Sequence, residues 1–525
     1  MAELHNAAAW LVDRHVAEGR GDNLAIICGD ERLTYADVQR QQWRAANALR
    51  ALDVRREERV ALVVNDEPAF VAWFLGAMRP GIVPVAMSTM LTAKELGSIV
   101  DDALAGVVVL SAGYAEHLPG LAEQAPSLRA AVVLGDAFSK HLAPPGGATC
   151  VEFAVHPSSD FDDDTEVAPA ATTAESPGFW LYSSGTTGVP KGVMHRHANL
   201  RATADTYGRS VLGIGEGDRC YSVAKLFFAY GLGNSLTFPF SVGASAVLDP
   251  GRPTPAGVAA NLAQHRPTLF FASPGFCAAM LDAEVPVEAM GSVRVAVTAG
   301  EALPADLHRR FTERYPVPVL DGIGSTEALH IFLSNHAGAE RPGTSGTTVA
   351  GYETRLLDDR DAEVVTADTP GYLHVKGDSI ATGYWCRTDA TRASFRGEWL
   401  RTGDVYTRSA DGYFTFLGRN HDMIKAGGIW VSPAEVENVL IQHPDVLEAA
   451  VVGARDAAGL ELTVAFVVAR SGHTIDPASV DAHCRANMAA FKRPRQVVTV
   501  DQLPKTATGK IRRFALREQL EAGST

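Results

Sequence analysis

The sequence predicts an α/β protein: a large N-terminal domain of layered mixed sheets with helices plus a β-rich subdomain, and a small α+β C-terminal domain. Three observations lead there. Apolar, β-type runs alternate with helical stretches through most of the chain, short strands dominate beyond Gly371, and a compact set of strands and helices follows Arg419. Alternating strands and helices form layered α/β sheets. The 525 residues allow two to four domains.

The first strand–helix–strand unit is the clearest local signal. Residues 60–64 are a short apolar run rich in β-branched side chains, and residues 82–86 are a second run. Between them, residues 68–79 predict a helix, because Pro68 suits a first turn and Gly81 lies beyond the end. Further strands are expected at 268–272 and 293–298, and a helix at 305–315.

The second half of the chain changes character. Residues 156–176 are rich in Ser, Asp, Thr and Ala, which indicates an exposed connector. Short strands are expected at 372–376 and 413–417, within the β-rich subdomain. The C-terminal unit contains strands at 447–452 and 461–468 and helices from Ser432-Pro433 and from Pro477. We place the boundary between domains 1–419 and 420–525.

Charge and cysteine content exclude several classes of protein. The net charge is -14, from 47 basic and 61 acidic residues, which argues against broad binding to nucleic acid. The six cysteines have no CxxC spacing, so a zinc site and a disulfide framework are disfavoured. Charged residues interrupt the N-terminal apolar stretch, and no apolar run reaches the roughly 18 residues of a spanning helix. We expect a cytoplasmic protein that binds neither nucleic acid nor membrane.

The segment YSSGTTGVPKG (182–192) is the first sign of chemistry. Its hydroxyls and backbone N–H groups can bind an oligophosphate, and Lys191 adds a positive charge. The spacing is not that of a Walker loop, in which a Ser or Thr follows the Gly-Lys pair. By itself the segment fits a mobile Ser/Gly surface loop equally well.

Six further motifs give this segment its meaning. They are TAGEALP (298–304), DGIGSTEALH (321–330), GYLHVKGDSIATGYW (371–385), WLRTGD (399–404), GRNHDMIKAGG (418–428) and LPKTATGKI (503–511). With the glycine-rich segment, their order and spacing resemble the adenylate-forming superfamily of acyl- and aryl-CoA ligases, peptide-synthetase adenylation domains and beetle luciferases. The resemblance covers nearly the whole chain. It implies an ATP-dependent enzyme that joins an acid to a thiol.

The resemblance assigns roles around ATP and Mg²⁺. Activation of a carboxylate brings anionic oxygens to the α-phosphate, so the site must supply positive charge. Lys510 is the implied catalytic cation, and the pair Thr326-Glu327 is implied in catalysis, with Glu327 and Thr187 at Mg²⁺. Asp404 resembles the ribose-binding acid. The implied ATP-binding residues are Ser183, Ser184, Gly185, Thr186, Thr187, Gly188, Lys191, Gly300, Glu301, Ala302, Asp321, Gly322, Asp404 and Arg419.

A second set of residues is implied by the thiol-transfer step. Members of this superfamily rotate the small C-terminal domain between the two half-reactions, and a few residues must act as a hinge. The hinge position here is His421, where relatives usually carry an acid or a lysine; it reads as a pH-sensitive hinge or as a tolerated substitution. The pantetheine tunnel of CoA is implied at Ala426, Gly427, Gly428, Ile429 and Trp430.

The acid is expected to be aromatic. Amino-acid-activating relatives place an Asp where this chain has Ala229, so an α-ammonium group would remain unpaired. The segments AKLFFAYGLGN and DGIGSTEALHIFLSN resemble benzoate-CoA ligases. That resemblance implies an apolar slot lined by Phe228, Ala229, Tyr230, Gly231, Ala299, Gly324, His330 and Ile331. Tyr230 and Ile331 could equally be core residues, and His330 a satisfied buried polar group.

Several alternatives stay open. The acceptor is free CoA or the phosphopantetheine arm of an acyl carrier protein, and both present the same thiol. A luciferase-type oxygenase would share all the nucleotide motifs. A nucleotide-binding pseudoenzyme is expected to have lost Lys510 or Glu327, and both residues are present. The sequence is compatible with a monomer or a homodimer.

Overall fold

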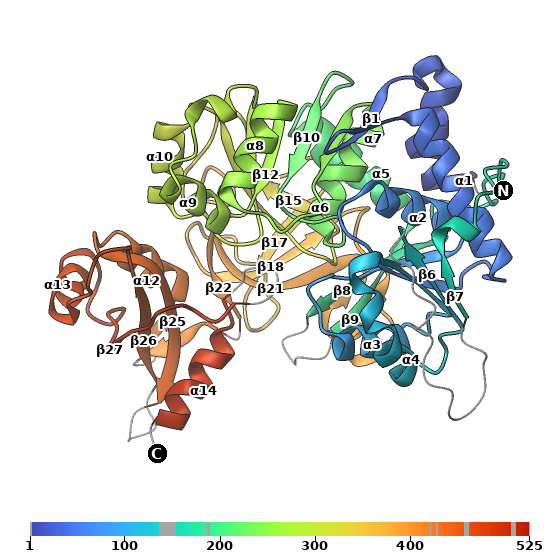
Figure 1. Cartoon of the computed structure of the whole chain (residues 1–525). Helices are drawn as coiled ribbons and strands as arrows, with labels where there is room; N and C mark the ends of the chain where they lie inside the picture. Colours follow the sequence, from blue (N-terminus) through green and yellow to red (C-terminus); the bar gives the residue numbers. More distant parts are fainter. Residues whose placement is uncertain are drawn as a thin grey trace.

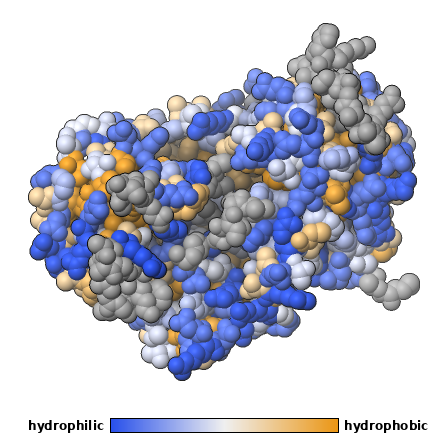
Figure 2. All heavy atoms as spheres, turned by 90° about the horizontal axis from the view of Figure 1, so that it is seen from below, coloured by the Kyte–Doolittle hydropathy of each residue, from blue (hydrophilic) through white to orange (hydrophobic). Residues whose placement is uncertain are grey.

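The structure is a computed structural model that describes residues 3–135, 154–184, 190–420, 422–426, 429–455, 461–505 and 511–523. Figure 1 shows two large sheets with helices around them and a smaller C-terminal unit to one side. Among the described residues, no helix combines the length and the apolarity needed to span a bilayer. The face seen in Figure 2 is mainly hydrophilic, with hydrophobic side chains in small groups.

The first large sheet contains eight strands and carries the glycine-rich segment. Its central strands are parallel, and β9 and β19 extend it in antiparallel pairing. The order is β19 (Gly383–Tyr384), β9 (Pro190–Arg196), β8 (Pro177–Ser184), β4 (Val83–Ala86), β3 (Arg59–Val63), β5 (Val107–Ser111), β6 (Ala130–Leu134) and β7 (Ala154–Pro157).

The second large sheet contains nine strands, most of them parallel, with antiparallel strands at its two sides. The order is β16 (Thr347–Thr348), β15 (Ile331–Ser334), β14 (Val319–Gly324), β13 (Val295–Thr298), β12 (Leu269–Ala272), β10 (Arg219–Ser222), β11 (Ser245–Leu248), β1 (Leu24–Cys28) and β2 (Glu31–Thr34).

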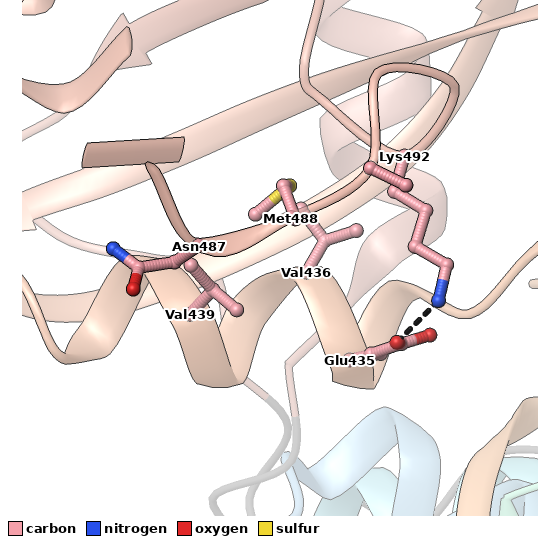
Figure 3. A pocket seen from close by; sticks show the side chains of 7 residues that line it. Glu435, Val436, Val439, Asn487, Met488 and Lys492 are labelled. Atoms are coloured by element: carbon pink, nitrogen blue, oxygen red, sulfur yellow. Dashed lines mark hydrogen bonds and ion pairs between the residues drawn. The ribbon is translucent and has the colours of Figure 1, made fainter. Parts of the chain in front are cut away.

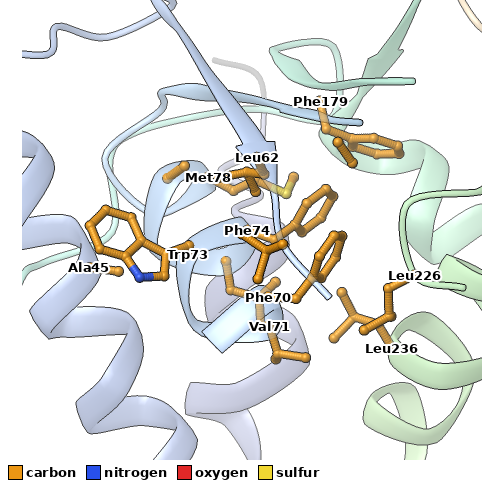
Figure 4. Close-up of a cluster of buried hydrophobic side chains, with 14 of the residues drawn as sticks. Ala45, Leu62, Phe70, Val71, Trp73, Phe74, Met78, Phe179, Leu226 and Leu236 are labelled. Carbon is orange, nitrogen blue, oxygen red and sulfur yellow. The ribbon is translucent and has the colours of Figure 1, made fainter. Parts of the chain in front are cut away.

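Buried helices separate the two sheets. Helix α2 (Pro68–Met78) is apolar on all sides and almost wholly buried, which fits a helix enclosed between layers. In Figure 4, Phe70 and Phe74 of this helix lie between Leu62 of the eight-stranded sheet and Leu236 beyond it. The layer also contains α1 (Tyr35–Ala51), α5 (His197–Thr203), α6 (Ala229–Leu232), η7 (Gly233–Thr237) and α7 (Phe238–Val242).

The outer faces of the sheets are covered by separate helices. Apolar side chains of α3 (Ala93–Asp102) and α4 (Leu118–Gln124) pack on the eight-stranded sheet. Those of α8 (Pro255–His265), α9 (Pro274–Asp282) and α10 (Ala305–Arg314) pack on the nine-stranded sheet. Each sheet is therefore covered by helices on both faces, as parallel sheets require.

The β-rich subdomain is a five-stranded antiparallel sheet. It shares a core with β12 to β15, through Leu356, Leu373 and Tyr406. Helix α11 (Thr388–Ser394) precedes its strand β20. The strands are β17 (Glu353–Leu357), β18 (Gly371–Lys376), β21 (Trp399–Arg408), β20 (Phe395–Arg396) and β22 (Phe414–Arg419), which pairs with β21.

The C-terminal unit has its own core. A hairpin of β23 (Ile424–Ala426) and β24 (Ile429–Val431) leads into a sheet of β25 (Val446–Arg455), β26 (Glu461–Ala469) and β27 (Gln496–Thr499). One face of this sheet is covered by α12 (Pro433–Ile441) and α13 (Pro477–Asn487), and the other by α14 (Arg513–Gly523). The Ser432 hydroxyl donates to the Leu417 carbonyl of β22, which joins this unit to the subdomain.

The predicted elements match the structure to within a few residues, and the α/β fold class is confirmed. The connector at 156–176 differs in detail from the expected exposed segment. Its first residues belong to β7, Thr172 is buried, and the Asn47 amide binds the carbonyls of Asp163 and Thr165. Composition marked it as a loop but could not show these anchors, because Asn47 and His5 lie 116 or more positions away in the sequence.

Candidate active site

Strands β8 and β9 hold both ends of the glycine-rich segment. Ser183 pairs with Lys191 and Ser184 pairs with Pro190 in antiparallel register. Gly185, Thr186, Thr187 and Gly188 lie between these strands and outside the described residues. Gly192 packs closely on Tyr182, because a Cβ there would lie 3.1 Å from the Tyr182 ring and would displace it slightly. The pairing of β8 with β9 therefore fixes the position of the Lys191 main chain.

The turn between β14 and β15 carries Thr326 and Glu327. The Thr326 carbonyl accepts from His195 Nε2 at 2.9 Å, and the Glu327 carbonyl accepts from the Ala381 N–H at 2.8 Å. Burial lowers the pKa of His195 to about 3, so its ring is neutral. The Asn199 amide donates to Nδ1 at 2.9 Å, which leaves Nε2 as the donor. The turn is thus tied to β9 of the other sheet.

Tyr384 joins the two groups that the sequence placed near the phosphates. Its hydroxyl donates to Glu327 Oε1 at 2.8 Å, and Lys191 Nζ lies 5.0 Å from the centre of its ring. Burial, followed by the Glu327 charge, raises the pKa of Tyr384, so the hydroxyl keeps its proton. Residues from β9, from β19 and from the β14–β15 turn therefore meet at one point.

The predicted ribose site lies in the β-rich subdomain. Asp404 on β21 is buried, and its Oδ1 lies 3.0 Å from Nε of Arg419 on β22. The Arg419 guanidinium also donates to the Thr402 carbonyl at 3.1 Å. Asp404 raises the pKa of Arg419, and Glu327 contributes in the same direction. This places the ribose and magnesium candidates within one electrostatic neighbourhood.

The predicted adenine residues lie at the carboxyl ends of β13 and β14. Gly300 has φ +98° in the exposed loop that follows β13, with Glu301 and Ala302 next to it. The Asp321 carboxylate accepts from the Thr298 hydroxyl at 2.9 Å, and burial raises its pKa to about 8. Asp321 therefore holds the start of this loop with its side chain. Carboxyl ends of parallel strands are where ligands bind in such sheets.

The predicted aryl residues converge on the neighbouring end of the same sheet. Tyr230 in α6 donates to the Val297 carbonyl of β13 at 3.1 Å, and its ring centre lies 5.5 Å from that of His330. Gly324 pairs with Ile331 across the β14–β15 hairpin. The remaining members lie beside these: Phe228, Ala229 and Gly231 at α6, and Ala299 after β13. All eight predicted residues thus come from adjoining elements.

His330 is the polar member of this group. It is buried, burial lowers its pKa to about 3, and its Nε2 lies 3.1 Å from Asn234 Oδ1. The rings of Tyr207, Tyr230 and Phe238 surround it, with centres between 4.5 and 5.5 Å away. A neutral imidazole among aromatic rings offers a hydrogen bond without a charge.

Most of the predicted C-terminal residues lie outside the described residues: Lys510, His421, Gly427 and Gly428. The main chain of the proposed pantetheine segment is described on either side of the two glycines. Ala426 ends β23 and Ile429 and Trp430 belong to β24, with Ala426 paired to Ile429. The described residues on the two sides of the glycines are therefore antiparallel strand partners.

A magnesium ion fits the site that Glu327 marks. Among the described residues, no group of three or more His, Cys, Asp or Glu side chains could hold a metal alone. Mg²⁺ that travels with ATP needs only one or two carboxylates, since phosphates and water fill the remaining positions. The partly exposed Glu327, which shares Tyr384 as a neighbour with Lys191, meets that need.

Three residues near the site were absent from the sequence prediction. They are Tyr384, Asn234 and Asp66, whose carboxylate accepts from the Leu226 N–H at 2.9 Å. Tyr384 stands in the motif GYLHVKGDSIATGYW and Asn234 in the segment KLFFAYGLGN. Membership of these segments could have marked both residues as candidates. Asp66 follows β3 and had no such signal, because its partner lies 160 positions away.

A separate cavity of about 230 Å³ lies in the C-terminal unit. Figure 3 shows Val436 and Val439 of α12 facing Met488, with Lys492 bonded to Glu435 at one side. None of the predicted site residues lines it. It lies between α12 and the segment after α13, apart from the groups described above.

The chain belongs to the AMP-binding enzyme family. The family model matches residues 13–385, and a model for the AMP-binding enzyme C-terminal domain matches residues 435–510. This confirms the expected adenylate-forming superfamily.

Individual relatives narrow the class. A benzoate–CoA ligase of Thauera aromatica is 44% identical over 520 residues, which are 98% of this chain and 96% of that protein. The crystal structure of a benzoate CoA ligase from Burkholderia xenovorans LB400 is 42% identical with a TM-score of 0.88, over 98% of this chain and 100% of that one. An anthranilate CoA ligase in complex with anthranoyl-AMP gives 37% identity and a TM-score of 0.92, over 100% and 99% of the chains. The expected closeness to benzoate-CoA ligases is confirmed.

Proposed function

We propose that this chain is an AMP-forming benzoate–CoA ligase. It uses ATP to convert an aromatic carboxylic acid to an aryl-adenylate with release of pyrophosphate, and then transfers the acyl group to the thiol of CoA. The observation that carries the proposal is the position of the eight predicted aryl-slot residues, which lie around α6 and the β14–β15 hairpin. The same hairpin carries Glu327 on its turn. One element thus presents the acid and the phosphates to each other.

In the first half-reaction a carboxylate oxygen attacks the α-phosphorus, and the bond to the β-phosphate breaks. A Mg²⁺ ion bound with the ATP would supply neutralisation of phosphate charge. We assign Lys191 to the outer phosphates, Glu327 to the metal and Lys510 to the carboxylate and α-phosphate. Asp404 and Arg419 hold the ribose end of the nucleotide. Positive charge placed where negative charge accumulates lowers the barrier most.

In the second half-reaction the CoA thiol sulfur attacks the acyl carbon, its proton passes to water, and AMP leaves with the bonding electrons. We propose that domain 420–525 rotates about His421, so that Lys510 leaves the site and the segment Ala426–Trp430 takes its place. The separate core of the C-terminal unit supports such motion, because its apolar faces are covered by its own helices.

The residues predicted to line the aryl slot favour an acid with a flat ring. Ala229 and Gly231 are small, and Gly231 packs directly on the backbone of Lys225, so no side chain at position 231 extends toward the ring. Tyr230 and the neutral His330 contribute ring faces and edges. An α-ammonium group would find no carboxylate at position 229, which disfavours amino acids.

The test measures pyrophosphate release over a panel of acids: benzoate, 2-aminobenzoate, 4-hydroxybenzoate, cyclohexanecarboxylate, hexanoate and phenylalanine. Benzoate or a ring-substituted benzoate is expected to give the highest kcat/KM. Highest activity with hexanoate or phenylalanine would overturn the aryl assignment. A pseudoenzyme would bind ATP and release no pyrophosphate with any acid.

A second assay identifies the acceptor. Benzoyl-adenylate formed in place is offered either free CoA or a holo acyl carrier protein, and the thioester is measured by mass. We expect transfer to free CoA. Transfer to the carrier protein alone would contradict the assigned acceptor, and light emission or oxygen uptake would point to the oxygenase.

A further inference from the structure

Tyr384 lies where packing fixes its ring. It ends β19 and pairs with Val193 of β9. Its N–H donates to the Thr391 hydroxyl at 3.0 Å, and its ring meets Phe395 edge-on with centres 5.3 Å apart. The residue is 8% exposed. Its hydroxyl and its ring face therefore have defined directions.

The hydroxyl points at the metal candidate. It donates to Glu327 Oε1 at 2.8 Å, a hydrogen bond to an ionised acceptor and so one of the stronger kinds. Holding one carboxylate oxygen fixes the direction in which the other faces. Without this bond, the Glu327 side chain could rotate about its terminal torsion, which is broad.

The ring face holds the phosphate candidate. Lys191 Nζ lies 5.0 Å from the ring centre, within the range of a cation–π contact. A lysine is a point charge on a flexible four-carbon stem, so a contact along its path limits where the charge can lie. One side chain thus orients an anion and a cation that serve the same ligand.

The main chain of the turn is held by other groups. The carbonyls of Thr326, Glu327 and Ala328 accept from His195, Ala381 and Ser379, at 2.9, 2.8 and 2.7 Å. These bonds support a strained turn, since Leu329 has φ +66°. A change at the Tyr384 hydroxyl therefore alters the direction of the Glu327 side chain and leaves the turn in place.

We propose that Tyr384 is a positioning residue that sets the Glu327 carboxylate and the Lys191 ammonium at the separation that Mg²⁺-bound ATP requires. The proposal rests on the proposed function for the roles of Glu327 and Lys191. It adds a residue that acts on the nucleotide through Glu327 and Lys191 and not by direct contact.

The test titrates full-length protein with ATP by calorimetry, with and without Mg²⁺ and without any carboxylic acid. In Tyr384→Phe the ring remains and the hydroxyl is lost. ATP affinity without Mg²⁺ is expected to stay within about twofold of wild type, and the gain in affinity on adding Mg²⁺ is expected to fall about tenfold. Tyr384→Leu also removes the ring, so affinity without Mg²⁺ falls a further two- to fivefold, roughly.

Tyr413→Phe is the matched control. The Tyr413 hydroxyl donates to the Ala339 carbonyl at 3.0 Å and Arg341 lies 5.0 Å from its ring centre, so the same kinds of contact occur away from the site. This variant should bind ATP as wild type does. Thermal midpoints are compared for all variants, because a purely structural role would lower the midpoint without changing the Mg²⁺-dependent gain.

An unchanged Mg²⁺-dependent gain in Tyr384→Phe would overturn the proposal. Should that variant fail to fold, Thr391→Val is the second test. It keeps the Tyr384 hydroxyl but removes the acceptor of the Tyr384 N–H, which loosens the main chain there. The Mg²⁺-dependent gain in ATP affinity is then expected to fall about threefold, less than the loss of a full hydrogen bond would cause. An unchanged gain there would overturn the proposal equally. The titration contains neither acid nor CoA, so an error in the proposed acid substrate would leave these results unaffected.

Discussion

The aryl residues and the nucleotide residues of this chain are held in place by different forces. The aryl residues come from one sheet and its adjoining helix, and His330 is fixed among the rings of Tyr207, Tyr230 and Phe238. The nucleotide residues come from both sheets and the β-rich subdomain. Glu327 and Arg419 among them are partly exposed and held by hydrogen bonds and ion pairs.

The difference indicates a division of labour. Close packing selects an acid by shape, because an overfilled slot forces side chains from their preferred rotamers. Charged groups held by directional bonds stabilise the charges of the reaction, because their placement is already paid for by the fold. Substitutions on one side should therefore change the kinetics of one substrate and leave the other unchanged. Four predictions probe the two sides: three through the kinetics, and one, Asp66→Asn, through stability.

Lys510→Ala should give the largest effect, confined to the first half-reaction. Adenylate formation is expected to fall about a hundredfold or more, because a positive charge is lost where negative charge develops. Transfer from supplied benzoyl-adenylate to CoA should remain within about threefold, a factor worth less than 1 kcal/mol. Rapid-quench assays of each half-reaction measure both. Equal loss in the two steps would contradict the role assigned to Lys510.

Asp66→Asn tests a buried acid whose partner, the Leu226 N–H, lies just before the aryl segment. Burial raises the pKa of Asp66 from 3.8 to about 7, with Lys225 acting against the shift and Asp249 and Glu67 adding to it. The folded protein keeps this proton between pH 4 and pH 7, whereas the unfolded chain releases it. Wild-type stability should therefore fall as pH rises through this window, by at most about 4 kcal/mol from this group.

The measurement is the difference in thermal stability between Asp66→Asn and wild type as a function of pH. The advantage of the variant should grow from pH 4 to pH 7 and stay constant above. Other groups that titrate there, such as Asp321, cancel in the difference. A difference that does not change with pH would show that the Asp66 pKa is not raised.

Asp404→Asn should weaken the binding of ATP and leave the binding of benzoate unchanged. Loss of the carboxylate charge removes a charge-assisted partner for the ribose, so KM for ATP is expected to rise about tenfold. KM for benzoate should stay within a factor of about two, within the usual scatter for distant sites. Asp411→Asn is the control, since Asp411 also binds an arginine, Arg341, at 2.8 Å but on the exposed surface. A matching rise in KM for benzoate would argue against separate sides.

Gly233→Ala should weaken the binding of benzoate and leave the binding of ATP unchanged. A Cβ at Gly233 would lie 2.3 Å from His330 Cδ2, so the imidazole must shift within the aryl group of residues. KM for benzoate is expected to rise about fivefold or more, because overpacking costs about 1–3 kcal/mol. Gly217→Ala is the control, because a Cβ there meets open space among the described residues. An unchanged KM for benzoate would remove His330 from the slot.

Local sequence signals were enough for most elements. Pro68 and Gly81 bracket α2, and the apolar run at 60–64 becomes β3, because helix ends and strand periodicity are properties of neighbouring residues. Family motifs then brought the candidate residues together. Asp404 and Arg419, fifteen positions apart, proved to be ion-paired neighbours on paired strands.

The sequence by itself determined the α/β class, the order of the elements and the adenylating family, because these depend on periodicity, turn residues and contiguous motifs. Tertiary structure alone decided that Tyr384 faces both Glu327 and Lys191, and that Asp66 binds Leu226. Those contacts join segments from different sheets or distant loops. Their distances depend on how whole layers pack, which no local pattern in the chain records.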